Sequence, residues 1–129
     1  MNDKIIMKIE HKIHHDGSES YHLNGKIHRA DGPALINSDG EEFWHLNGEL
    51  HRTNGPAIIY TNGAELWYLN GKLHRTDGPA IIFIDGSECW YFNNKLHREN
   101  GPAVIYHGAE AWFLNGEQQN ELHQQRIFS

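Results

Sequence analysis

Four His-Arg pairs recur along the chain and are its most obvious candidates for chemistry. They are His28-Arg29, His51-Arg52, His74-Arg75 and His97-Arg98. Imidazole is a common zinc ligand, so a ladder of histidines suggests a metal site. If each repeat contributes two strands about 4.8 Å apart, equivalent histidines lie about 10 Å apart. Metal–nitrogen bonds of about 2.1 Å cannot join them. We therefore expect a structural role, with hydrogen bonds to backbone carbonyls or to a neighbouring Asp or Asn, and neither metal nor cofactor.

A denser histidine group lies near the start of the chain, at His11, His14 and His15. Three imidazoles at this spacing leave a zinc site open as an alternative. The single cysteine, Cys89, replaces apolar residues at the same position of other repeats, so we interpret it as a packing residue.

Carboxylates recur beside the histidines and raise the question of acid/base catalysis. They are Glu19, Glu42, Glu65, Glu88 and Glu110, each two residues before a recurring aromatic position. We expect some of them to pair with the repeat arginines. An active site needs one asymmetric constellation in a shaped pocket, whereas here every repeat has the same set. The sequence therefore predicts that the protein is not an enzyme.

The recurring aromatic position sets the period of the chain. Tyr21, Trp44, Trp67, Trp90 and Trp112 follow one another at intervals of 23, 23, 23 and 22 residues. Such a period is typical of a repeat array, in which each unit buries surface against its neighbours. We expect one repeat domain over 1–129, with an N-terminal cap and partial unit at 1–20. Repeats at 21–43, 44–66, 67–89 and 90–111 are followed by a partial repeat and C-terminal cap at 112–129.

Three series of turn dipeptides divide each unit. Asp85-Gly86 represents the first series, Asn70-Gly71 the second, and Asp77-Gly78, followed by Pro79-Ala80, the third. Asn-Gly and Asp-Gly supply the positive φ of two-residue hairpin turns, and Pro79 should begin a strand. We predict one hairpin per unit, closed at Asp85-Gly86, and a tight connection through residues 95–98. The fold is then an elongated, all-β antiparallel meander of about five units.

The two faces of this sheet follow from a two-residue turn. Ile81 would lie opposite Trp90 and Phe83 opposite Glu88, which gives a core face that carries the tryptophans. The opposite face would carry Ile36, Ile59, Ile82 and Ile105 with the residues that follow the tryptophans. These post-tryptophan residues are His45, Tyr68, Tyr91 and Phe113. Because they vary within a fixed frame and aromatic residues are common anchors, we predict that they bind a protein.

Both ends of the chain depart from the repeat. Ile5, Met7 and Ile9 alternate with other residues and suggest a capping strand. After residue 116 the His-Arg and Gly-Pro-Ala signatures disappear and no helix breaker follows, so we expect a short C-terminal helical cap. The start lacks a continuous apolar segment, and we expect neither a signal peptide nor a membrane span.

Charge and cysteine content narrow the partners and the compartment. The formal net charge of −6 argues against a general binder of nucleic acid or of anionic membranes. The 11 histidines could reverse that charge under mildly acidic conditions. One cysteine cannot form an intrachain disulfide, so a reducing cytoplasm is the expected setting. Two alternatives stay open: single-stranded nucleic acid, bound by aromatic and Arg ladders, and self-assembly through exposed sheet edges.

The Asn-Gly-x-x-His element, with a later Asp-Gly turn and a 23-residue period, resembles MORN repeats over roughly residues 11–117. The match departs where the family usually has His-Gly-x-Gly and this chain has His-Arg-x-Asp-Gly, and in a tryptophan one residue farther from the Asn-Gly turn. The variant Trp-Tyr-x-Asn-Gly-x-x-His-Arg-x-Asp-Gly-Pro-Ala is also similar to repeats in small proteins of bacteriophages and large DNA viruses. The resemblance implies a hairpin array that serves as an interaction surface, and a phage-encoded inhibitor of a host protein, acting in the host cytoplasm, as its sharper form.

Overall fold

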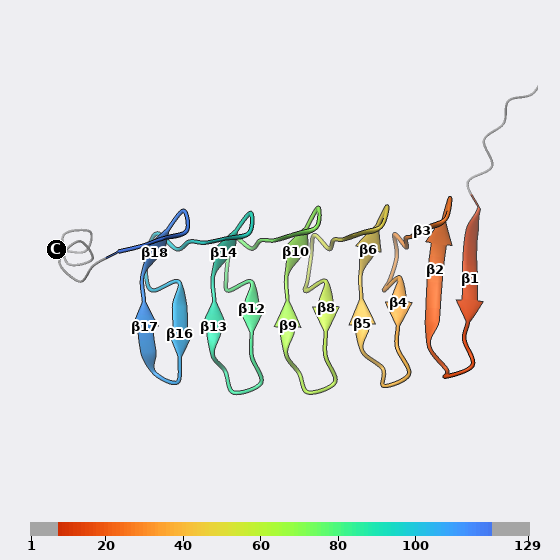
Figure 1. Ribbon diagram of the computed structural model, residues 1–129, viewed down its shortest axis with the longest axis horizontal. Helices are drawn as coiled ribbons and strands as arrows, with labels where there is room; N and C mark the ends of the chain where they lie inside the picture. The colour runs from red at the N-terminus through yellow and green to blue at the C-terminus, as the bar shows by residue number, and fades with distance from the viewer. Residues whose placement is uncertain (1–7, 120–129) are drawn as a thin grey trace, which may run out of the picture.

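The computed structural model describes residues 8–119, and every regular element within this range is a β-strand. Figure 1 shows a single elongated layer in which similar units follow one another along the long axis. The predicted all-β hairpin array is therefore confirmed. Residues 8–119 contain no helix that is long and apolar enough to cross a membrane.

The main sheet is an open antiparallel meander of eleven strands. Along the sheet they run in the order β1 (Ile9–Ile13), β2 (Glu19–Leu23), β4 (Leu35–Ile36), β5 (Glu42–Phe43), β8 (Ile58–Ile59), β9 (Glu65–Leu66), β12 (Ile81–Ile82), β13 (Glu88–Cys89), β16 (Val104–Tyr106) and β17 (Ala109–Ala111), with β3 (Lys26–Ile27) paired to β2 off this path. Each unit thus adds one hairpin, and the second strand of one hairpin pairs with the first strand of the next.

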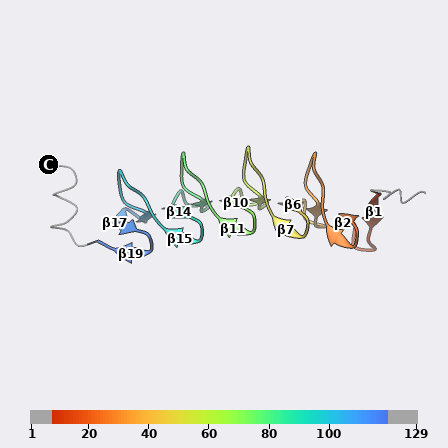
Figure 2. The same cartoon turned by 90° about the horizontal axis from the view of Figure 1, so that it is seen from above.

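A second row of short hairpins follows the main sheet. Its four pairs are β6 (His45–Leu46) with β7 (Glu49–Leu50), β10 (Tyr68–Leu69) with β11 (Lys72–Leu73), β14 (Tyr91–Phe92) with β15 (Lys95–Leu96), and β18 (Phe113–Leu114) with β19 (Glu117–Gln118). The row crosses the upper edge of the sheet in Figure 1, and β7, β11, β15 and β19 line up along one side in Figure 2. One hairpin per unit was therefore wrong, because the expected connection at residues 95–98 begins with a strand.

Three of the tryptophans join the two rows. The Trp44 amide donates to the Ala57 carbonyl of the main sheet at 2.7 Å, whereas the Trp44 carbonyl accepts from the His51 amide of the second row at 2.9 Å. The same pair of bonds recurs at Trp67 and Trp90. The backbone of one residue thus satisfies both sheets, which is why strand pairing breaks there.

The two turn series have different lengths. Asn70 and Gly71 have φ of 50° and 78°, which is the two-residue hairpin turn that the sequence predicts. In the main sheet the Phe83 amide donates to the Ser87 carbonyl at 2.9 Å, so the loop holds three residues, 84–86. Gly86 closes it at φ 87°, as in a type I turn followed by a left-handed residue. The two-residue turn predicted at Asp85-Gly86 was therefore wrong.

The extra loop residue changes the register of the hairpin by one. Ile81 pairs with Cys89, not with Trp90, and Ile82 pairs with Glu88. A slip of one residue moves a strand's side chains to the opposite face. The last unit is one residue shorter than the others because its turn is shorter. His107 and Gly108 form a two-residue turn between Tyr106 and Ala109, so this unit spans 22 residues.

Alanines, not tryptophans, are the fully buried residues of this thin layer. Ala34, Ala57, Ala80 and Ala103 have no exposed surface, and no large side chain among residues 8–119 is fully buried. The tryptophans in that range are half-buried, so the expected tryptophan core is corrected to an alanine seam. Since residues 8–119 form no second layer over the sheet, both faces keep partly exposed side chains.

The ends of the array are described in part. Of the expected N-terminal capping strand, Ile9 begins β1, whereas Ile5 and Met7 lie outside the described residues. At the other end, Glu117–Gln118 form β19. The remainder of the segment expected to form a helical cap lies outside the described residues.

Candidate functional site

The repeat arginines are held inside the array. The Arg75 guanidinium carbon lies 3.7 Å from the centre of the Trp67 ring, and Arg75 Nη1 donates to the Pro79 carbonyl at 3.1 Å. Arg29, Arg52 and Arg98 repeat both contacts, with Tyr21 in place of tryptophan under Arg29. A cation over an aromatic face is attracted to it, and the arginine also shields the ring from water.

The glycine of each Gly-Pro-Ala makes room for this arginine. A Cβ built on Gly78 would lie 2.6 Å from Arg75 Cζ, and the corresponding distances at Gly32, Gly55 and Gly101 are 2.7–2.8 Å. These four glycines are not among those with positive φ. Their role is close packing, whereas Gly71 and Gly86 serve the turns.

Two of the four repeat arginines lack the carboxylate that the other two have. Arg29 Nε donates to Asp31 at 3.1 Å and Arg75 Nε donates to Asp77 at 3.0 Å. Asn54 and Asn100 stand at this position of the Arg52 and Arg98 units, and within residues 8–119 Arg52 Nε is buried without a partner. The expected pairing of arginines with the recurring glutamates is not found among residues 8–119, where Glu88 instead accepts from Trp90 Nε1 at 3.3 Å.

We expect Asn54→Asp to raise the free energy of unfolding by about 0.5–1 kcal/mol, because it gives a buried donor a charged acceptor. Chemical denaturation measures the change. Asp77→Asn is the reciprocal control and should lower stability by a similar amount. An Asn54→Asp variant no more stable than the wild type would show that Arg52 Nε gains no acceptor in this way.

The repeat histidines connect adjacent units. His51 Nδ1 accepts from the Asn70 amide of the next unit at 2.9 Å, and the same bond recurs from His28 to Asn47, from His74 to Asn93 and from His97 to Asn115. The sequence prediction named backbone carbonyls or Asp and Asn side chains as partners, whereas these bonds use the backbone N–H. Each requires an Nδ1 without a proton. The histidines thus hold the second row of hairpins together.

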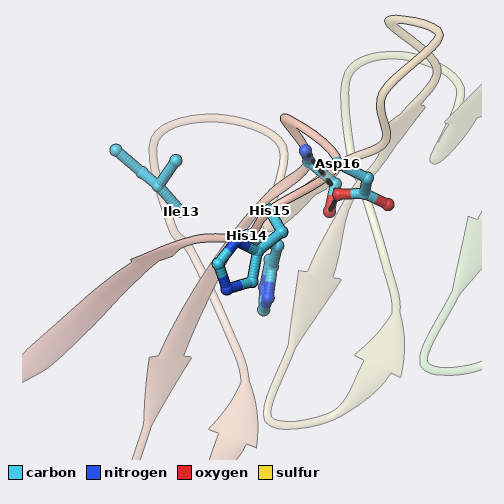
Figure 3. A pocket seen from close by; sticks show the side chains of 5 residues that line it. Ile13, His14, His15 and Asp16 are labelled. Atoms are coloured by element: carbon cyan, nitrogen blue, oxygen red, sulfur yellow. Dashed lines mark hydrogen bonds between the residues drawn. The ribbon is translucent and has the colours of Figure 1, made fainter.

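The N-terminal histidines are divided among other partners. His11 Nε2 lies 2.8 Å from a Glu19 carboxylate oxygen, and His14 Nε2 lies 3.0 Å from Ser20 Oγ. Figure 3 shows His14 and His15 in an open hollow by the first turn, with Ile13 directed away from them. Among residues 8–119 no group of three or more His, Cys, Asp or Glu could hold a metal ion.

The post-tryptophan residues are half-buried at the start of the second-row hairpins. Partial burial raises the pKa of the Tyr68 phenol, and Tyr60 adds to the shift. Burial likewise raises the pKa of Tyr91, with smaller contributions from Cys89 and Tyr68. Burial lowers the pKa of His45, and a backbone hydrogen bond at Phe43 offsets part of this shift. Because side chains alternate along a strand, Tyr68 lies on the same face as Leu66 and Tyr91 on the same face as Cys89. Ile81 pairs with both Leu66 and Cys89, so these residues share one surface.

This surface is the face of the main sheet that carries Leu35, Ile58, Ile81 and Val104; with Tyr68 and Tyr91 we call it the aromatic face. The register places Phe43, Leu66, Cys89 and Ala111 on it as direct partners of those four residues. Ile36, Ile59, Ile82 and Ile105, which the sequence assigned to this face, instead pair with the glutamates on the other side. The error follows from the three-residue loop.

Sequence reasoning missed three aromatic members of this face. They are Tyr60, Phe83 and Tyr106, each next to a main-sheet turn. Tyr60 packs edge-on against Phe43, with ring centres 6.3 Å apart, and Phe83 and Tyr106 are 40% and 56% exposed. The sequence did contain the information needed to find them, in the one 22-residue interval between recurring aromatic residues. A two-residue turn in that shorter unit implies three-residue loops in the 23-residue units. Cys89 lies half-buried among them, and burial raises the pKa of its thiol.

Three troughs lie on the other side, between the loops that follow the His-Arg pairs. The middle one has Trp67, Leu69 and His74 at its base, with residues 52–54 and 75–77 as its walls. Equivalent troughs surround Trp44 and Trp90. We call them the Trp44, Trp67 and Trp90 troughs, with volumes of about 310, 300 and 480 Å³ respectively. The two inner loops, 52–54 and 75–77, each form a wall of two neighbouring troughs, whereas the outer loops, 29–31 and 98–100, each line one.

No family model, curated protein or solved structure matches this chain.

Proposed function

We propose that the chain is a non-catalytic protein-binding module that uses the aromatic face. The observation that carries this proposal is the continuity of that face across units, with no second layer over it in the part of the chain that the structure describes. Ile81, Cys89 and Tyr91 are only half-buried, although side chains of this kind are usually covered in a finished core. Contiguous exposed apolar surface of this kind favours association with another protein.

The tyrosines suit the centre of such an interface. Tyr68 and Tyr91 have a half-buried ring, and neither hydroxyl has a hydrogen-bond partner among residues 8–119. A tyrosine contributes a rigid apolar ring and a hydroxyl that can bond to a partner, which is why this residue is enriched in binding hot spots. His45 and Phe113 occupy the same position at the two ends of the row.

The nucleic-acid alternative has less support from the geometry. Its cations would be the repeat arginines, yet Arg29 and Arg75 are 26% and 19% exposed, and their guanidinium groups are already engaged by a ring and a carbonyl. Phosphate binding relies on accessible cationic groups.

A specific feature does favour self-assembly: all five residues of β1 are exposed at one edge of the main sheet, and Ile13 is 73% exposed. Light scattering distinguishes that assembly from a monomer.

The sharper proposal, drawn from the resemblance to viral repeats, is a phage-encoded inhibitor of a host defence protein that acts in the host cytoplasm. A tagged pull-down from a bacterial lysate, washed at low and high salt, tests it. We expect a stoichiometric protein that survives high salt, because an interface with an apolar centre depends little on screening. Recovery of nucleic acid alone, lost at high salt, would overturn the proposal.

We expect Tyr68→Ala with Tyr91→Ala to weaken capture of that partner by at least about tenfold, since truncated hot-spot residues typically cost 2 kcal/mol or more each. Titration of the purified partner measures the affinity. Lys72→Ala with Glu117→Ala, on exposed positions of the second-row hairpins, is the control. If both double variants bind like the wild type while remaining folded, the aromatic face is not the contact surface.

A further inference from the structure

The troughs form a regular series on the side of the array opposite the aromatic face. Trp67 and Leu69 line the middle trough, whereas Tyr68, between them, does not. The residue two positions after the tryptophan is Leu46, Leu69 or Phe92, and Phe92 is 44% exposed. Each trough therefore offers an apolar base between two polar walls, at a size suited to one or two side chains.

The spacing of the troughs selects the shape of an occupant that runs along them. Each unit contributes two main-sheet strands, so equivalent troughs lie about 9.6 Å apart. A polyproline II helix presents the same side every three residues, or about 9.3 Å. An extended strand repeats its side about every 6.7 Å and an α-helix has a pitch of about 5.4 Å, so neither places one equivalent group in each trough.

The charge of the walls indicates what else the occupant carries. The loops at 29–31 and 75–77 carry Asp31 and Asp77, which are 88% and 80% exposed. The loop at 98–100 carries Glu99, which is 78% exposed. The arginines of the same loops are turned inward and engaged by aromatic rings. The exposed charged groups along the rims are thus carboxylates, which pair on one side with their own loop and on the other can accept hydrogen bonds from lysine or arginine of a ligand.

We propose that the three troughs bind a basic, proline-rich segment of another protein in the polyproline II conformation. Every third residue of this segment would enter a trough, one residue per trough. Aromatic-lined grooves suit this ligand because it is already ordered and loses little entropy on binding. The proposal is independent of the aromatic face, since the two surfaces lie on opposite sides of the layer.

A labelled peptide of three Pro-Pro-Arg triplets tests the proposal by fluorescence anisotropy against the wild-type chain. We expect saturable binding that becomes at least about tenfold weaker when glycine replaces every proline, because the flexible peptide must then be ordered. A Pro-Pro-Glu peptide should bind at least about tenfold more weakly because it faces rim carboxylates. If the glycine peptide binds as tightly as the Pro-Pro-Arg peptide, binding depends on charge alone and the proposal is wrong. The proposal is also wrong if the Pro-Pro-Arg peptide does not bind.

Phe92→Ala and Phe83→Ala form a matched pair of variants on opposite faces, with wild-type exposures of 44% and 40%. We expect Phe92→Ala to weaken the Pro-Pro-Arg peptide by about fivefold or more and Phe83→Ala to leave it unchanged. The reverse pattern would place the peptide on the aromatic face and overturn the trough assignment. A thermal melt of each variant shows that the fold is intact, and the peptide series on the wild type is informative without either variant.

Discussion

A single methyl group added as Gly78→Ala is expected to lower the free energy of unfolding by about 2–3 kcal/mol. The new Cβ would lie 2.6 Å from Arg75 Cζ, so the guanidinium must leave its place over Trp67. Its bonds to the Pro79 carbonyl and to Asp77 are lost with it. The loss combines a partly desolvated cation–π contact with charge-assisted hydrogen bonds, and each is typically about 1–2 kcal/mol. Denaturant melts of the two proteins measure the difference.

A double-mutant cycle separates this collision from any general intolerance of alanine. Arg75→Ala alone should be destabilising, and adding Gly78→Ala to it should cost little, because no guanidinium then occupies the space. The expected coupling energy is therefore close to the whole effect of Gly78→Ala. If Gly78→Ala costs the same in both backgrounds, the packing role assigned to this glycine is wrong.

Acidification from pH 7.5 to pH 5 is expected to lower the free energy of unfolding of the array, because burial holds the pKa of His45 below the ordinary 6.5. The contribution of His45 to stability is fully present above pH 6.5 and is lost as the pH falls toward the folded value. Thermal melts over this pH range measure the loss.

A variant that does not titrate at this position supplies the control. His45→Phe places there the residue type that Phe113 provides at the same position of the last unit. We expect this variant to lose stability less steeply on acidification. A wild type that is equally stable at both pH values, or a variant with the full pH dependence, would contradict the role of His45.

The length of a turn could be predicted from the sequence only where the turn dipeptide allows a single loop length. Asn70-Gly71 forms the expected two-residue turn, and at Asn93-Asn94 the substitution is explained by Asn94 Oδ1, which accepts from the Leu73 amide at 2.8 Å. Asp85-Gly86 fits a two-residue or a three-residue loop equally well. The wrong choice reversed the face assigned to the isoleucines, because side chains alternate along a strand.

The packing of the arginines could not be predicted from the spacing. Gly78 follows Asp77 and precedes Pro79, so it reads as a turn residue, and only the position of the Arg75 side chain shows that space is what the glycine provides. The post-tryptophan residues, in contrast, were predicted to bind a protein from their variation within a constant frame, and that stays a prediction. Their aromatic neighbours Tyr60 and Phe83 lie in the loop region of the sequence and join them only after the register is known.

The direction of the main-sheet strands has a mechanical consequence. The strands cross the long axis of the molecule in Figure 1, so the bonds between them run along that axis and are loaded in series when the two ends are pulled apart. Each interior boundary rests on strands of only two or three residues and a few second-row bonds. Tension therefore opens one boundary at a time, and the array yields in steps of one unit at low force.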